Sequence, residues 1–191
     1  MATSMTAQPQ SPFSDEAKLV RQALTDAEAF AELYRRHVKH VYRYHIAHTG
    51  DIKDAEDLTS QTFMAALESI RSFRGEGPFA AWLMGIASRK RALFFRGRRP
   101  QVPLEAATEL PDGSLATDEA AGQRLQLAAV ARALKQISAE RAEAIILYTF
   151  AGLTYRETGA LLGKSEAAVK MLVARGLQDL RQRTSLSLEV E

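Results

Sequence analysis

The sequence AGLTYRETGALLGKSEAAVK, residues 151–170, decides the fold that we expect for the C-terminal part of the chain. Thr154 followed by Glu157 has the spacing of a capping box, in which two side chains satisfy backbone N–H groups at a helix start. Gly163 allows a tight turn because positive φ costs glycine little, and Ser165 is a typical cap for a second helix. The stretch therefore predicts a helix-turn-helix.

The second helix of this motif has one apolar and one outward face. We expect Val169, Leu172 and Leu177 to pack it against the domain. A major groove about 12 Å wide admits one α-helix, whose N-terminal residues meet base edges. A plain helical hairpin with a glycine corner is the simpler alternative. The residues predicted to contact DNA are Thr154, Tyr155, Arg156, Ser165, Glu166, Ala167, Ala168, Lys170, Met171 and Arg175.

Helical periodicity dominates the rest of the chain, and no stretch alternates long enough to predict a strand. Asp26 and Gly50 bracket a helix over 27–48, a second helix is expected over about 51–73, and Pro78 is placed to open a third. We therefore predict an all-α fold with two helical domains joined by a flexible linker. The predicted segments are a disordered tail (1–14), a first domain (15–97), an acidic Pro/Gly linker (98–122), a helix-turn-helix domain (123–184) and a tail (185–191).

The net charge of +2 conceals strong differences along the 191 residues. Residues 71–100 carry eight basic and one acidic side chain, whereas residues 101–122 carry five acidic and no basic ones. A basic block of this density is typical of a surface that binds polyanions, although a solvated helix face has the same composition.

The absence of cysteine excludes disulfides and thiolate-bound metal. No run approaches the ~20 apolar residues of a membrane span, so we expect a cytoplasmic protein without membrane insertion.

The basic block contains aromatic residues as well as cations. Residues 89–99 place six cations around Phe94 and Phe95. Aromatic side chains stack on unpaired bases, whereas duplex backbone binding needs only cations, so the block suits melted DNA. Taken singly, each phenylalanine is more often a core residue.

The sequence predicts no enzyme, cofactor or metal site. His37, His40, His45 and His48 lie on one helix as two pairs about 12 Å apart, too far for one ion. His37 falls in the apolar stripe, and we interpret it as packed. No phosphate loop or nucleophile elbow is present.

The two halves together resemble the bacterial sigma-70 family, in particular its extracytoplasmic-function (ECF) sigma factors. Asp54-Ala55-Glu56-Asp57-Leu58-Thr59 with Phe63 is similar to the helix that docks on core RNA polymerase. Trp82-Leu83 with Ile86-Ala87 and the cations that follow resemble the helix facing the −10 element. Residues 151–170 resemble the −35-reading helix-turn-helix. The resemblance covers about residues 26–183.

The resemblance implies a set of partners and contacts. The partners are core RNA polymerase (through the β′ clamp helices and β flap), promoter DNA both duplex and melted, and an anti-sigma factor or other regulator. The loop 72–79 would take a flipped −10 base, and the linker would thread the polymerase channel. The implied −10 residues are Phe73, Arg74, Trp82, Arg89, Lys90, Arg91, Phe94, Phe95, Arg96, Arg98 and Arg99. The implied polymerase-binding residues are Asp54, Glu56, Asp57, Leu58, Gln61 and Phe63.

Two other classes of protein remain open from the sequence. One is a stand-alone helix-turn-helix repressor or activator that binds duplex DNA without polymerase. The other, more distant, is a helical enzyme or metal protein built on the histidine helix. Promoter-specific transcription with core polymerase distinguishes the first from a sigma factor, and metal analysis tests the second.

Overall fold

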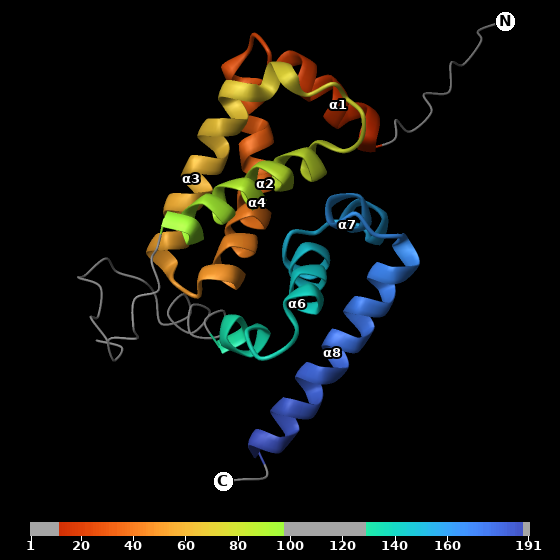
Figure 1. Cartoon of the computed structure of the whole chain (residues 1–191). Helices are drawn as coiled ribbons and strands as arrows, with labels where there is room; N and C mark the ends of the chain where they lie inside the picture. Colours follow the sequence, from red (N-terminus) through yellow and green to blue (C-terminus); the bar gives the residue numbers. More distant parts are fainter. Residues whose placement is uncertain (1–11, 98–128, 189–191) are drawn as a thin grey trace, which may run out of the picture.

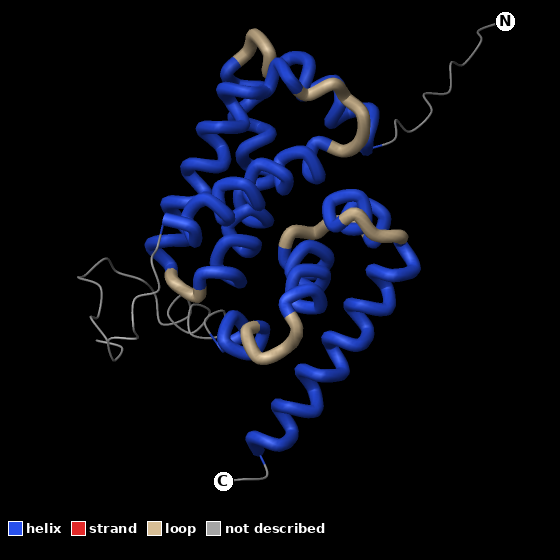
Figure 2. Tube along the Cα trace, in the orientation of Figure 1, coloured by secondary structure: helices blue, strands red, loops and turns tan. Residues whose placement is uncertain are grey.

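The computed structural model describes residues 12–97 and 129–188, and these residues contain helices, turns and loops but no strand (Figure 2). The predicted linker and the outermost parts of both tails lie outside these ranges. The described helices form two groups, one from each half of the chain (Figure 1). The helices are α1 (Pro12–Gln22), α2 (Ala27–Thr49), α3 (Ile52–Ser69), the 3-10 turn η1 (Ile70–Ser72), α4 (Phe79–Gly97), α6 (Ala139–Ile145), the π-helical turn η2 (Ile146–Phe150), α7 (Tyr155–Leu162) and α8 (Glu166–Leu188).

Local capping chemistry sets the predicted helix boundaries. The Asp26 side chain accepts a hydrogen bond from the Glu28 N–H at 2.9 Å, and Gly50 ends α2 at φ 71°. Asp51 caps α3 by accepting from the Asp54 N–H at 2.8 Å. Both helix starts are thus confirmed, because one side chain satisfies an otherwise free N–H in each case.

The first domain packs around α2. Leu33, Val41 and Tyr44 of α2 are fully buried, as are Leu83 and Ala87 of α4. α3 packs along α2, and α4 crosses both (Figure 1). This core holds α4 rigidly, so the cations at its C-terminal end have a defined position.

Helices extend into both predicted tails. Residues 12–14 belong to α1, whose Val20 packs into the core, as does Ala23 directly after its end. Pro12 is compatible with a helix start, because proline has no N–H to satisfy there. At the other end α8 continues to Leu188, past the predicted boundary at 184.

The second domain consists of the helical residues 129–134 followed by α6, η2, α7 and α8. Ile145, Ile146, Leu147 and Leu153 are buried together with Val169 of α8. The two domains are in contact, because η2 packs on α2 and α7 on α4. None of the described helices is both long enough and apolar enough to cross a membrane.

Candidate nucleic-acid interface

The helix-turn-helix has the predicted hydrogen bonds. Thr154 accepts from the Glu157 N–H at 3.2 Å, and the Glu157 carboxylate accepts from the Thr154 N–H at 2.7 Å, which confirms the capping box. Gly163 adopts φ 65°, the left-handed conformation expected for the turn. Ser165 accepts from the Ala168 N–H at 3.2 Å and so caps α8. All of these contacts are local in sequence, which explains why they could be predicted.

The outward face of α8 also matches the prediction in position. Glu166, Ala167, Lys170, Met171 and Arg175 are exposed, and Ala168 is half-buried. Of the predicted packing residues, Val169 is buried and Leu172 is partly buried.

Leu177 was assigned to the wrong face of α8. It is 38% exposed, whereas Val173 and Gly176 are buried and Leu180 packs against the core. The buried series 169, 173, 176, 180 follows the helical repeat, and Leu177 lies one residue beyond it.

Two stacked tyrosines lie beside the first turns of α8. The rings of Tyr148 and Tyr155 stack 4.1 Å apart at 7°. The Lys170 ammonium lies 5.6 Å from the Tyr155 ring centroid and 3.0 Å from the Glu166 carboxylate. A hydrogen bond with Tyr148 raises the pKa of Tyr155. Tyr148 was missed by the sequence analysis, because its contact depends on η2 turning back toward α7.

Gly159 is a second residue that was missed. It is buried within α7, and the Lys164 N–H donates to its carbonyl oxygen at 2.8 Å. A methyl group at this position would lie 2.6 Å from the Lys164 carbonyl oxygen. Only glycine therefore allows the turn to approach α7 this closely.

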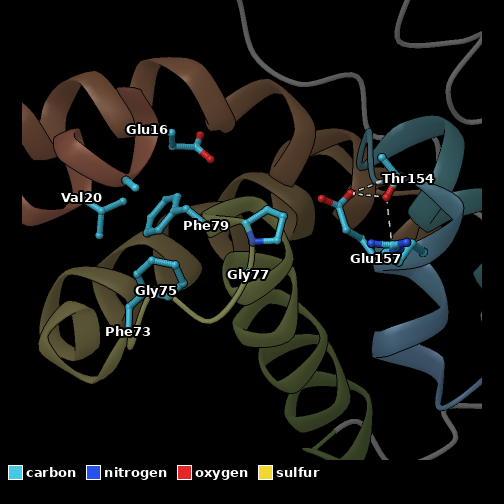
Figure 3. Close-up of a pocket in the computed structure, with 11 residues that line it drawn as sticks. Glu16, Val20, Phe73, Gly75, Gly77, Phe79, Thr154 and Glu157 are labelled. Carbon is cyan, nitrogen blue, oxygen red and sulfur yellow. Dashed lines mark hydrogen bonds between the residues drawn. The ribbon is translucent and has the colours of Figure 1, made fainter. Parts of the chain in front are cut away.

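An aromatic cluster and a groove lie at the start of α4. Phe79 is buried, and the rings of Phe73 and Trp82 have centroids 5.7 and 5.4 Å from it. Beside them a groove of about 700 Å³ runs between the loop 73–78 and the Thr154 end of α7 (Figure 3). Arg74 is exposed at this loop. Predicted −10 and −35 residues thus line one groove.

The basic helix α4 presents only some of its predicted residues to solvent. Arg89 and Arg96 are exposed, Phe95 is 46% exposed, and Lys90 and Phe94 are half-buried. Arg98 and Arg99 lie outside the described residues. Arg91 is the exception on this helix, because it turns toward the second domain and pairs with Glu143 at 2.5 Å.

The predicted polymerase-binding face of α3 needs a correction. Glu56, Asp57 and Gln61 are exposed and Asp54 is half-buried, but Leu58 and Phe63 are buried at 1% and 5% exposure. These two side chains face the core, as α3 requires for packing on α2, so neither is available to a partner.

Two exposed apolar residues on α3 were not predicted as contacts. Met64 and Leu67 are 63% and 52% exposed. Met64 follows Gln61 by three residues and Leu67 follows Met64 by three, so both adjoin the polar face formed by Asp57 and Gln61. Large apolar side chains of this exposure, gathered on one helix, are typical of protein contact surfaces.

His37 and His45 are buried and make hydrogen bonds within the first domain. His37 is buried as predicted, with Nε2 2.8 Å from Glu16, and that hydrogen bond holds the pKa of Glu16 below its usual range. His45 lies 3.0 Å from the Thr62 hydroxyl. Within residues 12–97 and 129–188 no group of three or more histidine, aspartate or glutamate side chains is placed to hold a metal ion.

Two buried histidines predict acid sensitivity. Burial, with Arg91 nearby, lowers the pKa of His45 to about 3 and that of His48 to about 2. Both titrate near 6.5 when unfolded, so below pH 6.5 the unfolded chain takes up protons that the folded chain does not. The free energy of unfolding should therefore decrease as the pH is lowered from 7, by up to about 2 kcal/mol per histidine at pH 5. Urea unfolding at pH 7 and pH 5 measures this, and His45→Gln should reduce the difference. Equal stability at both pH values would contradict the prediction.

These features define a two-domain, all-α, DNA-binding protein with a helix-turn-helix in its second domain. The model for sigma-70 region 2 matches residues 33–100, and that for sigma-70 region 4 matches residues 127–180. The chain belongs to the sigma-70 family, in its ECF group, whose members are transcription initiation factors that recognise promoters.

Individual relatives agree with this assignment. The sigma factor NccH of Alcaligenes xylosoxydans xylosoxydans is 30% identical over 86% of this chain and 91% of its own length. The ECF sigma factor BldN of Streptomyces coelicolor is 32% identical over 87% of this chain, which spans 66% of BldN. The solved structure of CnrH in complex with the cytosolic domain of CnrY is 25% identical, with a TM-score of 0.66 over 91% of this chain and 98% of CnrH. RpoE of Bartonella quintana, 23% identical with a TM-score of 0.58 over 80% of this chain and 94% of its own, shares the fold.

Proposed function

We propose that this chain binds core RNA polymerase and directs promoter recognition, DNA melting and initiation, with α8 reading the −35 element. The observation that carries this assignment is the N-terminal outward face of α8. There Lys170 and Arg175 are exposed while Val169 and Val173 anchor the helix. A rigidly anchored helix with exposed small and basic residues in its first turns fits a major groove.

The −10 element is assigned to the start and outer face of α4. The loop 73–78 places Phe73 and Trp82 beside the exposed Arg74, and Arg89, Phe95 and Arg96 follow along the helix. Cations spaced along a helix, combined with aromatic rings on which bases can stack, suit single-stranded DNA. Each stacked base contributes roughly 1–3 kcal/mol. A flipped base needs such a site because unstacking it costs a few kcal/mol.

The polymerase contact is assigned to the outer face of α3. Glu56, Asp57 and Gln61 supply its polar part, while the exposed Met64 and Leu67 supply the apolar part. An apolar centre with a polar rim is the usual composition of a protein interface.

A protein regulator of the anti-sigma class is assigned as a further partner. CnrH was solved with CnrY, and RpoE of Bartonella quintana with the anti-sigma factor NepR. The groove between the loop 73–78 and α7 offers an apolar surface for such a partner in this chain. We place the protein in the cytoplasm, where core polymerase acts.

Transcription with purified core polymerase tests the proposed function. The chain should confer initiation at promoters selected from genomic DNA by the reconstituted holoenzyme. Tight, specific duplex binding by the chain alone, without stimulation of transcription, would instead indicate a stand-alone regulator.

Tyr148 supplies a prediction about −35 selectivity. Tyr148→Ala removes the ring that supports Tyr155 and, through it, Lys170. An aromatic pair is worth about 0.5–1.5 kcal/mol, so the preference of holoenzyme for its −35 sequence should fall about 2-fold to 12-fold. Competition binding at fixed salt measures this preference. Tyr148→Phe keeps the stack and serves as the control; equal losses in both variants would contradict a positioning role for the ring.

A further inference from the structure

The first described helix, α1, lies outside the residues that match the sigma-70 region 2 model. That match begins at residue 33, whereas α1 spans Pro12–Gln22. α1 packs against both α2 and α4, and its Val20 is buried in the core of the first domain. A segment outside the matched residues therefore reaches the start of α4, where the candidate −10 residues lie.

Glu16 connects α1 to two other helices. The Nε2–H of His37 on α2 donates to the Glu16 carboxylate at 2.8 Å, since an ionised carboxylate only accepts. The His37 and Glu16 side chains are 11% and 21% exposed, so water competes little for this hydrogen bond. The bond to His37 is the main cause that holds the pKa of Glu16 below its usual range, and the Phe79 N–H acts in the same direction. One carboxylate thus interacts with α2 and with the first residue of α4.

The helix α4 begins after a proline rather than after a residue that can cap it with its side chain. The Pro78 carbonyl oxygen accepts from the Ala81 N–H at 3.1 Å, but the proline ring has no acceptor for the N–H groups of the first turn. Those N–H groups need partners, and a helix N-terminus favours a negative charge. Glu16 supplies an acceptor and a charge there from a different helix.

The loop 73–78 is held mainly at its ends. It contains two glycines with positive φ, and an added Cβ at either would meet no atom within 4 Å. The Phe79 ring centroid lies 5.4 Å from that of His37 and 5.7 Å from that of Phe73. Figure 3 shows Glu16, Phe73 and Phe79 gathered on one side of the groove. The contacts of Phe79 therefore determine where the loop ends and α4 begins.

We propose that Glu16 is a positioning residue for −10 recognition, because its carboxylate holds the start of α4 and thereby places Phe73 and Trp82 to receive an unstacked base. The proposal rests on the proposed function, since it takes the loop 73–78 and the start of α4 to bind the melted −10 strand. Glu16 acts through Phe79, whose buried ring contacts both Phe73 and Trp82. A site that is ordered before the strand arrives loses less entropy on binding.

Glu16→Gln tests the proposal, because it keeps the size of the side chain and removes its charge. Hydrogen bonds to an ionised acceptor are about twice as strong as neutral ones, so the start of α4 should be held less firmly. Holoenzyme should bind a fluorescein-labelled single strand carrying the −10 element about tenfold more weakly, a change of about 1.4 kcal/mol. Its affinity for a −35 duplex, and the affinity of the chain for core polymerase, should stay within about twofold of wild type, because both contacts lie away from Glu16.

Asp15→Asn is the matched control. Asp15 is the neighbouring residue on α1 and is exposed, so this variant removes the same charge from a side chain that faces solvent. Its binding of the −10 strand should stay within about twofold of wild type, as is usual for a surface substitution. Glu16→Asp keeps the charge but is one methylene group shorter, and it should weaken −10 binding in the same direction as Glu16→Gln.

Trp82 reports the position of the α4 start directly, because it is the only tryptophan in the chain. Its ring centroid lies 5.4 Å from that of Phe79, so a displaced helix start changes its surroundings. In the free chain, acrylamide should quench the fluorescence of Trp82 more efficiently in Glu16→Gln than in wild type or Asp15→Asn.

The outcomes separate the two proposals. Unchanged −10 binding by Glu16→Gln, an equal loss in Asp15→Asn, or a loss without a change in Trp82 quenching overturns the role of Glu16. A parallel loss of core polymerase affinity also overturns it, because it would show general destabilisation of the first domain. Failure of the wild-type chain to direct transcription with core polymerase overturns the proposed function itself.

Discussion

Replacing both Met64 and Leu67 with glutamate is expected to abolish transcription directed by the chain while leaving its fold intact. Both side chains are more than half exposed on α3, so the substitutions leave the core unchanged. Buried apolar anchors at the centre of an interface typically contribute 2 kcal/mol or more each. Two lost anchors together with two added charges should weaken core polymerase binding at least about 100-fold, measured by competition with labelled wild-type chain.

The control for this experiment is a pair of exposed residues away from α3, Leu24 in the turn after α1 and Leu177 on α8. Leu24 and Leu177 are also partly exposed apolar residues, but they lie outside the α3 face. Leu24→Glu with Leu177→Glu adds the same charge and should leave polymerase affinity within about threefold. Helical content and the urea midpoint should be close to wild type for both double variants. Undiminished polymerase binding by the α3 variant would show that the contact lies elsewhere.

The helix boundaries were predictable because short-range chemistry determines them. Asp26 and Thr154 each satisfy an N–H two or three residues away, and Gly50 and Gly163 each end a helix in the left-handed conformation. All of these signals lie within a few residues of the feature they determine. The outward face of α8 followed from periodicity once its start was known.

The residues that sequence reasoning misplaced depend on contacts between distant segments. Leu58 and Phe63 match a family pattern for docking, but the pattern does not say which face of α3 packs on α2. Arg91 and Glu143 are 52 residues apart, so their pairing could not be anticipated from a basic run. The α1 helix was also missed; its Val20, and Ala23 directly after its end, pack into the core.

Gly159→Ala is expected to destabilise the helix-turn-helix and with it −35 recognition. Alanine is more favourable than glycine within a helix by about 0.5–1 kcal/mol, so helix propensity alone predicts a gain in stability. The contact predicts a loss, because the new methyl would lie 2.6 Å from a backbone carbonyl oxygen that cannot rotate away. Relieving it requires α7 and the turn at Gly163 to separate, which at typical overpacking costs amounts to about 2–3 kcal/mol.

The separation of α7 from the turn also shifts α8, since Ser165 and Val169 follow the turn directly. We therefore expect Gly159→Ala to reduce duplex −35 binding by holoenzyme at least tenfold, with polymerase binding through α3 retained. Gly97→Ala makes the same chemical change at a helical glycine with nothing within 4 Å of the added methyl, and it should not destabilise the chain. Urea unfolding of both variants shows whether helix propensity or the steric contact of the added methyl group dominates. If Gly159→Ala is as stable as wild type, the close approach of the turn does not require glycine.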